Sequence, residues 1–368
     1  MIRKTLMLIA SLLFLLSARQ ETADITGSGE LHFEGIVQTS KGEPLSSVIV
    51  EVEGSRAETD ADGRFILDGV QPGHAAISLT GMEGTGQYFV NLDQSQDGFI
   101  FEYPVVTTVI FLHDNDLHFN FNHRDEFEAK IEEIRERYEN VWLLNGGDTF
   151  VRHADRWVTN DTSYYADQSR FMIDTMNEVG YDLGVPGNHE MDYVGTHTGQ
   201  SLEAAGFPLI AANIDVATTI LPQFKPFTIL ETKNGLTIAV LGLSTVNFDK
   251  PGVTQRDYSE TVQAYSNLAV ENDLFMILSH IGLNSDEMLA ESFPELDLII
   301  GGHSHTLLET AKMVNGVLIA QAGGPPPRHQ VDPDWPKYLG KVKVVFENGV
   351  LTEKSGHVIT IGEPVDRD

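Results

Sequence analysis

The sequence of 368 residues contains no cysteine. Without cysteine the fold cannot be cross-linked by disulfides, and any metal ion must be held by nitrogen and oxygen ligands. Basic residues are also few, with 24 Lys and Arg against 54 Asp and Glu, which gives a formal net charge of −30 at pH 7. Such a surface repels nucleic acids and anionic membranes. We therefore expect no nucleic-acid polymer as a partner, and chemistry on phosphate would need a local positive centre.

The hydrophobic run near the N-terminus is too short to cross a membrane, which takes about 20 apolar residues. It extends from Leu6 to Leu16, follows two basic residues and precedes Ser17 and Ala18. This order of charged, hydrophobic and small residues is typical of a secretory signal. We expect residues 1–18 to be a bacterial signal peptide, so that the protein is periplasmic or secreted and keeps no stable membrane span after cleavage.

Residues 30–103 show short alternating segments, such as HFEGIVQ and GRFILDGV, between turns rich in Gly, Pro and Asp. This pattern predicts a small antiparallel, immunoglobulin-like β-sandwich. Asp60 and Asp62 could belong to a calcium loop, but a hairpin turn explains them without an ion. The stretches GIVQTSKGEPLSSVIVEV and TDADGRFILDGVQPG resemble the carboxypeptidase regulatory-like sandwich. That resemblance implies an accessory domain without chemistry of its own, and it leaves the partner of the sandwich unknown.

Residues 104–368 follow a different pattern, in which buried strands alternate with helices. The expected strands include VVTTVIFL, VWLL, YDLGV, LTIAVLGL, LFMILSH and LDLIIGGH, and the expected helices include EFEAKIEEIRERY and SRFMIDTMNEV. Further alternating strands follow at VLIAQAG, GKVKVVFENG and HVITI. The alternation predicts a layered α/β domain with parallel strands that are buried on both faces.

Five of these expected strands are followed by Asp, Asn or His, the residue types that can bind metal ions. Taken singly, a histidine after a strand is more often a surface or core residue, and Gly-Gly-Asp is often only a turn. Together they indicate one site, because function in such sheets lies beyond the carboxyl ends of the strands. The seven candidate ligands are Asp116, His118, Asp148, Asn188, His280, His303 and His305. Seven ligands are too many for one tetrahedral zinc but suit two divalent ions that are bridged by Asp148, with zinc, manganese, iron and cobalt all compatible.

The phrases HDNDLH, LNGGDTF, GNHEMDYV, LSHIG and IIGGHSH, in this order, resemble the calcineurin-like metallophosphoesterase superfamily. Within it they are most similar to the catalytic domain of the bacterial 5′-nucleotidase family. The resemblance implies a four-layer αββα sandwich with a dinuclear metal centre. It places one ion among Asp116, His118, Asp148 and His305, and the other among Asp148, Asn188, His280 and His303. Glutamine often stands at the position of His305 in that family.

The same resemblance makes His189 the catalytic histidine and Asp192 its partner. A carboxylate three residues on can fix the orientation of an imidazole, although Asp192 could instead be a helix N-cap. The implied reaction is hydrolysis of small phosphate esters, with nucleotides as one candidate, by in-line attack of a metal-bound hydroxide. His189 would stabilise the transition state or protonate the leaving alkoxide.

Two alternatives remain open at this point. Phosphodiesters such as cyclic nucleotides would use the same metal core. A non-catalytic envelope or carbohydrate-binding protein, in which the sandwich carries the function, has no need of the seven ligands. The resembled family also has a further domain that contacts the nucleotide, whereas this sequence ends at Asp368. Candidate substitutes for those contacts, with ordinary loop and packing roles as the alternative, are Arg152, His153, Arg156, Arg328, His329, Phe119, Phe150 and Trp157.

Overall fold

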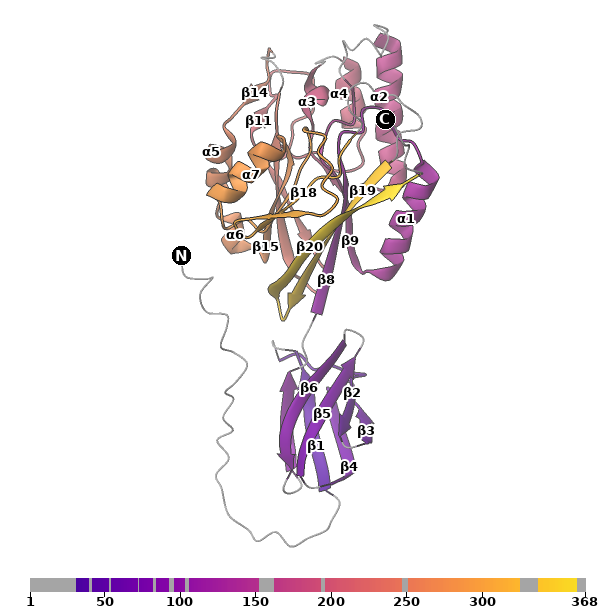
Figure 1. The fold of residues 1–368 in the computed structure, drawn as a ribbon, viewed down its shortest axis with the longest axis vertical. Coiled ribbons are helices and arrows are strands. Elements are labelled where there is room, and N and C mark those ends of the chain that lie inside the picture. The colour runs from indigo at the N-terminus through magenta and orange to yellow at the C-terminus, as the bar shows by residue number, and fades with distance from the viewer. Residues whose placement is uncertain are drawn as a thin grey trace. The chain divides into compact units, whose positions relative to one another are not determined.

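The structure is a computed structural model, which describes residues 31–39, 42–52, 54–71, 73–81, 84–92, 96–102, 106–151, 162–192, 196–246, 251–324 and 337–362. The chain divides into two compact units, Met1–Tyr103 and Pro104–Asp368 (Figure 1). The segment expected to be a signal peptide lies outside the described residues. So do six candidate substrate contacts, Arg152, His153, Arg156, Trp157, Arg328 and His329. Within the described ranges, no helix has the length and apolarity that a membrane span requires.

The first unit consists of two β-sheets with a common core. One sheet has the order β4-β1-β7 and the other β3-β2-β5-β6. The strands are β1 Leu31–Gln38, β2 Ile49–Val52, β3 Ser55–Glu58, β4 Arg64–Val70, β5 Gly73–Gly81, β6 Gly84–Leu92 and β7 Gln96–Glu102. Alternate residues point inward, so that Phe33 and Phe65 of one sheet share a buried cluster with Val50 and Ile77 of the other.

The strand pairing and the turn at Asp60 are specific features of this unit. The strands β1 and β7 pair in parallel, whereas an antiparallel arrangement was expected. Parallel pairing is possible here because the whole second sheet lies between them in the chain. The Asp60 carboxylate accepts hydrogen bonds from the backbone N–H groups of Asp62 and Arg64, at 2.9 and 2.8 Å. Asp60 is therefore used in a turn, and the resemblance of the unit to the carboxypeptidase regulatory-like sandwich stays a prediction.

The second unit is built on two larger sheets. The five-stranded sheet has the order β10-β9-β8-β19-β20, with β8 Val106–Asp114, β9 Asn140–Asn145, β10 Leu183–Gly184, β19 Lys337–Glu347 and β20 Val350–Ile361. The six-stranded sheet has the order β12-β13-β15-β16-β18-β17, with β12 Phe227–Glu231, β13 Thr237–Ser244, β15 Leu274–His280, β16 Leu298–Ile300, β17 Lys312–Val314 and β18 Val317–Ala320. A small ribbon pairs β11 Ile214–Asp215 with β14 Thr254–Gln255.

Helices cover both sheets of this unit. They are α1 Arg124–Arg137, α2 Thr162–Val179, α3 Asn188–Asp192, α4 Thr196–Glu203, α5 Tyr258–Ala264, α6 Leu268–Glu271 and α7 Leu283–Ser292. In Figure 1, α1 and α2 lie on one side of the unit and α5, α6 and α7 on the other, with the strands between them.

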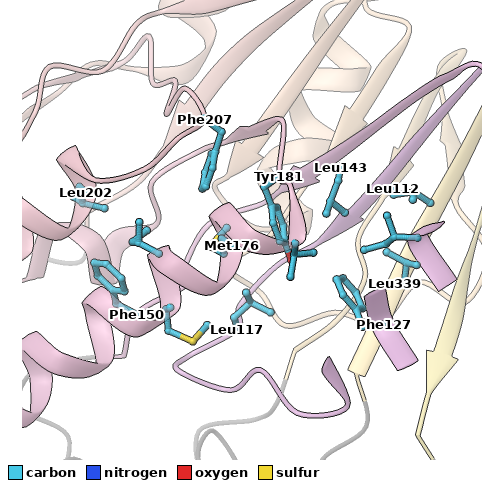
Figure 2. Close-up of a cluster of buried hydrophobic side chains, with 14 of the residues drawn as sticks. Leu112, Leu117, Phe127, Leu143, Phe150, Met176, Tyr181, Leu202, Phe207 and Leu339 are labelled. Atoms are coloured by element: carbon cyan, nitrogen blue, oxygen red, sulfur yellow. The ribbon is translucent and has the colours of Figure 1, made fainter. Parts of the chain in front are cut away.

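Three hydrophobic clusters separate four layers. The first packs α1 and α2 against the five-stranded sheet, and Figure 2 shows Phe127, Leu112 and Leu143 among its members. The second fills the space between the sheets, and the third lies between the six-stranded sheet and α5–α7. Neighbouring residues of β8 serve different clusters, since Leu112 belongs to the first and Phe111 to the second. This burial on both faces explains the continuous hydrophobic strands, and it confirms the predicted αββα architecture.

Candidate metal centre

The candidate ligands come from both sheets of the second unit. Strands β8, β9 and β10 run parallel in one sheet, and β15 and β16 run parallel in the other. Because parallel strands end at the same edge, the loops after them meet at one rim. Three overlapping groups of side chains form there, and within each group one ligand atom per residue lies within 4.8 Å of the others. The groups are Asp116, His118 and His305; His118, Asp148 and His189; and Asp148, His280 and His303.

Three buried polar atoms at this rim have no hydrogen-bond partner in the described part of the chain. They are Asp116 Oδ1, Asn188 Oδ1 and His280 Nε2. Buried polar atoms are rarely left unpaired, and such an atom needs an explanation. Carboxylate oxygen, amide oxygen and imidazole nitrogen are all ligands of divalent cations. The side chains present therefore fit divalent cations held between the two sheets.

Backbone carbonyl groups orient two of the imidazoles. His118 Nδ1 donates to the carbonyl oxygen of Phe150 at 3.0 Å, and His280 Nδ1 donates to that of Gly146 at 2.6 Å. With Nδ1 as the donor, Nε2 is the atom that carries the lone pair in the neutral form of each ring, and it faces the other candidate ligands. The structure thus fixes the tautomer that ligation through Nε2 requires.

The two carboxylates are also oriented by hydrogen bonds. Asp116 Oδ2 accepts from Asn115 Nδ2 at 2.6 Å and from the backbone N–H of His303 at 3.0 Å. Asp148 Oδ1 accepts from the backbone N–H of His189 at 2.9 Å, while its Oδ2 lies 3.2 Å from His280 Nε2. In each carboxylate one oxygen is occupied by these bonds and the other faces the imidazoles.

Five of the seven candidate ligands have a left-handed backbone. The φ angles are 54° for Asp116, 48° for His118, 53° for Asp148, 75° for His303 and 54° for His305. This conformation is uncommon for residues other than glycine and costs on the order of 1 kcal/mol or more each, so it persists only where surrounding contacts enforce it. Such strain is concentrated here on the loops that carry the candidate ligands.

The protein groups of the rim strongly perturb each other's pKa values. Burial opposes a charge on His280, but the carboxylate of Asp148 beside it raises the pKa of His280 to about 10. Burial likewise opposes a charge on Asp148, but His280 and His189 hold the pKa of Asp148 below its ordinary value. Burial together with the charge of His280 lowers the pKa of His303 to about 4. A cation that binds at Asp148 and His280 must therefore displace the proton of His280.

Glu190 is a further buried residue of the site, to which the sequence analysis gave no role. Its carboxylate accepts hydrogen bonds from the backbone N–H groups of Gly187 at 2.6 Å, Phe150 at 2.8 Å and Asp148 at 3.1 Å. Burial and the charge of Asp148 raise the pKa of Glu190 to about 7. Glu190 thus ties the loop after β9 to the loop after β10. Its position directly after His189 was the only signal in the sequence.

His189 lies at the start of α3, and its side chain is 12% exposed. Its Nε2 lies 3.6 Å from Asp148 Oδ2, and its ring meets the ring of His118 edge-on, with centroids 5.3 Å apart. By distance alone His189 could bind a cation as well as act in catalysis. Asp192 is the last residue of α3, but its side chain lies outside the described atoms, so the predicted pair of His189 and Asp192 stays a prediction.

Two aromatic residues that the sequence placed near the mouth of the site pack into the core. Phe150 is fully buried, and Phe119 packs against Phe150 and Tyr165 with centroid distances of 5.8 and 5.4 Å. Both residues belong to or pack against the cluster beneath α2. Ordinary packing, the alternative considered for them, is what the structure shows.

The chain is similar to known proteins in both sequence and structure. The chain is 32% identical to the uncharacterized metallophosphoesterase YunD of Bacillus subtilis over 57% of this chain and 46% of the relative. It is 29% identical to a 5′-nucleotidase of Vibrio cholerae over 68% of this chain and 51% of the relative. The structure of a 5′-nucleotidase precursor from Thermus thermophilus superposes with a TM-score of 0.55 and 25% identity, over 69% of this chain and 54% of the other. The chain thus spans about half the length of these relatives.

The family profile described as calcineurin-like phosphoesterase matches residues 110–307, which is more than half of the chain and includes all seven candidate ligands. The four-layer fold and the groups of carboxylate and imidazole ligands agree with this match. The chain therefore belongs to the calcineurin-like phosphoesterase family of metal-dependent phosphoester hydrolases.

Proposed function

We propose that this protein hydrolyses small phosphate monoesters at a dinuclear metal centre on the rim described above. The observation that carries the proposal is the set of three ligand groups linked through His118 and Asp148. Beside them lie three buried atoms without a hydrogen-bond partner among the described residues, Asp116 Oδ1, Asn188 Oδ1 and His280 Nε2. Two divalent cations, when bound, would polarise the phosphoryl group, promote ionisation of the attacking water and offset developing charge. They would also supply the positive centre that an acidic protein needs to attract phosphate.

The ligands are assigned to two positions. The first cation takes Asp116, His118, Asp148 and His305, and the second takes Asp148, Asn188, His280 and His303. The assignment is supported by the distances of 3.4 Å between Asp116 Oδ1 and His305 Nε2 and of 3.2 Å between Asp148 Oδ2 and His280 Nε2. It is also supported by the place of Asp148 in two of the three groups, which suits a bridging carboxylate. Zinc, manganese, iron and cobalt all suit these donors.

His189 is proposed as the residue that stabilises the transition state or donates a proton to the leaving alkoxide. Its Nε2 lies 3.6 Å from Asp148 Oδ2 and its side chain is 12% exposed, so we expect it to contact both the centre and an entering ester. Its backbone N–H is fixed by the carboxylate of Asp148, which limits the movement of the residue. Asp192 is proposed as its partner, because both residues belong to α3.

Nucleotides are the proposed substrate class, because relatives that match much of this chain are 5′-nucleotidases. The relatives are about twice as long as the aligned region, so their activity is taken here as a hypothesis for this chain. Residues 1–18 are proposed to direct export from the cell, which would place the enzyme among extracellular or periplasmic phosphate esters.

The test compares substrates under defined metal loading. Protein stripped with EDTA and then reloaded with manganese, zinc, cobalt or iron is assayed with p-nitrophenyl phosphate, bis(p-nitrophenyl) phosphate and adenosine 5′-monophosphate. Turnover of the two monoesters that depends on added metal supports the proposal. Turnover of the bis ester alone would replace it with a phosphodiesterase, and metal-loaded protein that turns over none of the three would refute it.

A further inference from the structure

Gln321 lies directly after β18 and is fully buried. Its side-chain amide makes three hydrogen bonds to the loop after β16. Nε2 donates to the carbonyl oxygen of Gly302 at 2.9 Å, and Oε1 accepts from Ser304 Oγ at 2.8 Å and from the backbone N–H of Thr306 at 3.2 Å. The three partners are alternate residues of the loop, and His303 and His305 are the residues between them. Both neighbours of each histidine are therefore hydrogen-bonded to the amide of Gln321.

The histidines of this loop need such support. His303 and His305 have φ angles of 75° and 54°, which are uncommon for residues other than glycine. Their side chains belong to different ligand groups, so small rotations of the loop would move both away from their partners. We propose that Gln321 is a positioning residue of the metal centre, which holds the loop so that the two imidazoles face different cations. This inference rests on the proposed function.

The segment that follows Gln321 holds the opposite side of the centre as well. The backbone N–H of Ala322 donates to Asn115 Oδ1 at 2.9 Å, and Asn115 Nδ2 donates to the carbonyl oxygen of Gly323 at 2.9 Å. The same Nδ2 also donates to Asp116 Oδ2. The segment Gln321–Gly323 therefore connects Asp116, which follows the five-stranded sheet, with the loop of His303 and His305, which follows the six-stranded sheet. The side-chain amide of Gln321 makes the contact with that loop.

A merely structural role of Gln321 predicts a different result from a positioning role. Any buried amide with good hydrogen bonds contributes to stability, and its removal leaves the partners unpaired. If stability were its only contribution, folded protein that lacks the amide would bind metal normally. Groups that orient metal ligands, by contrast, typically change metal affinity about 10-fold to 100-fold when they are removed. Metal affinity of the folded protein therefore separates the two roles.

The main variant is Gln321→Met, which keeps a similar length without hydrogen-bonding groups. The matched control is Asn140→Leu, because Asn140 is a buried amide at the opposite, amino end of β9. Its Nδ2 donates to the carbonyl oxygen of Thr108 at 3.4 Å, and its Oδ1 accepts from the backbone N–H of Lys233 at 2.9 Å. Binding of Mn²⁺ to EDTA-stripped protein is measured by calorimetry, at a temperature where circular dichroism shows each variant folded.

We expect Gln321→Met to bind Mn²⁺ about 10-fold to 100-fold more weakly than wild type, and Asn140→Leu to bind it like wild type even if its melting temperature falls. Ser304→Ala removes one of the three contacts at an exposed position, so it should fold, and we expect an affinity about 2-fold to 10-fold weaker. If Gln321→Met does not fold, the Mn²⁺ affinity of Ser304→Ala alone tests the positioning role.

Wild-type affinity in Ser304→Ala and in folded Gln321→Met would overturn the positioning role while leaving the metal centre intact. The positioning role would also be overturned if Asn140→Leu weakened Mn²⁺ binding as much as Gln321→Met does. Failure of the wild-type protein itself to bind Mn²⁺ or any of the other three metals would instead reject the metal centre, and the positioning role with it.

Discussion

The Nε2 atoms of His118 and His305 lie 3.1 Å apart, although 187 positions separate the two residues in the sequence. The rings are stacked, with centroids 4.9 Å apart and an angle of 14° between their planes. Because His118 Nδ1 is the donor to Phe150, its Nε2 presents a lone pair toward His305. Asp116 Oδ1 lies 3.4 Å from His305 Nε2 and 3.7 Å from His118 Nε2. The convergence of these three atoms supports the proposed first cation position.

Replacing His305 should empty the first metal position selectively. In His305→Ala the loop remains anchored by Ser304, but one ligand atom is lost, so we expect the affinity of one of the two ions to fall by roughly 100-fold or more. Metal analysis after gel filtration should then find one ion per chain in place of two. His305→Gln, which offers an amide oxygen, should retain more metal than His305→Ala. The exposed His357→Ala on β20 is the control, and equal metal contents in all variants would contradict the ligand assignment.

Replacing His189 should separate catalysis from metal binding. His189→Asn removes the imidazole but not the backbone N–H that contacts Asp148, so we expect two bound ions and a kcat that is lower by about 10²-fold to 10⁴-fold. Metal analysis and steady-state kinetics with p-nitrophenyl phosphate measure both quantities on the same preparation. Loss of one ion from this variant would show that His189 is a ligand, a role that its distance to Asp148 permits.

Local patterns were sufficient to predict a layered α/β domain and the rim at its strand ends, whereas the four layers were implied by the family resemblance. Hydrophobic strands such as that of β15 are continuous because parallel strands are buried on both faces, and a polar residue at their end marks the exit from the sheet. His280, the last residue of β15, is an example, and the structure brings it to Asp148 of the other sheet. The pairing itself could not be predicted from spacing, since it depends on how two sheets stack.

The supporting residues of the site could not be predicted for a different reason. Glu190, Gln321 and Asn115 are defined by hydrogen bonds to backbone groups that are distant in sequence. A glutamine after a hydrophobic strand has no pattern that distinguishes it from a surface glutamine. The positive φ angles of candidate ligands such as Asp148 could not be predicted from the sequence either, because tertiary contacts hold these residues in the left-handed conformation.

Removing one partner of the buried ion pair between Asp114 and Lys337 should strongly destabilise the fold. Asp114, the last residue of β8, accepts hydrogen bonds from Lys337 Nζ at 2.7 Å, Asn145 Nδ2 at 2.9 Å and Tyr181 Oη at 2.5 Å. Burial lowers the pKa of Lys337, although the charge of Asp114 opposes this. Lys337→Met leaves a buried carboxylate without its cation, so we expect a loss of about 3–5 kcal/mol in the free energy of unfolding, measured by urea titration.

The double variant Asp114→Asn/Lys337→Met, which removes both charges and keeps an amide oxygen as an acceptor for the neighbouring donors, tests the reason for that loss. If the cost comes from the uncompensated charge, removing both partners should be less destabilising than removing Lys337 alone. Lys343→Met, which breaks an exposed ion pair with Glu353, is the control and should change stability by about 1 kcal/mol or less. A double variant that is less stable than Lys337→Met would argue against this account.

Asp286 should make stability depend on pH near neutrality. This residue of α7 is fully buried, its Oδ1 accepts from Ser279 Oγ at 2.6 Å, and its Oδ2 has no hydrogen-bond partner among the described residues. Burial raises the pKa of Asp286 from 3.8 to about 7. Because the folded state holds the proton more tightly than the unfolded state, the stabilising contribution is complete below about pH 4 and is lost as the pH rises through about 7.

Asp286→Asn keeps the acceptor for Ser279 and cannot ionise, so it should remove this pH dependence. The difference in free energy of unfolding between variant and wild type should shift in favour of the variant by a few kcal/mol between pH 4 and pH 8, on the order of the 1.36 kcal/mol per pKa unit that linkage gives. Urea titrations in EDTA at four pH values measure this difference, in which the titration of groups that do not interact with Asp286 cancels. The exposed Asp167→Asn on α2 controls for the loss of one charge. A difference between Asp286→Asn and wild type that stays constant with pH would mean that Asp286 is already ionised in the folded protein at pH 4, with a cation or water satisfying its Oδ2.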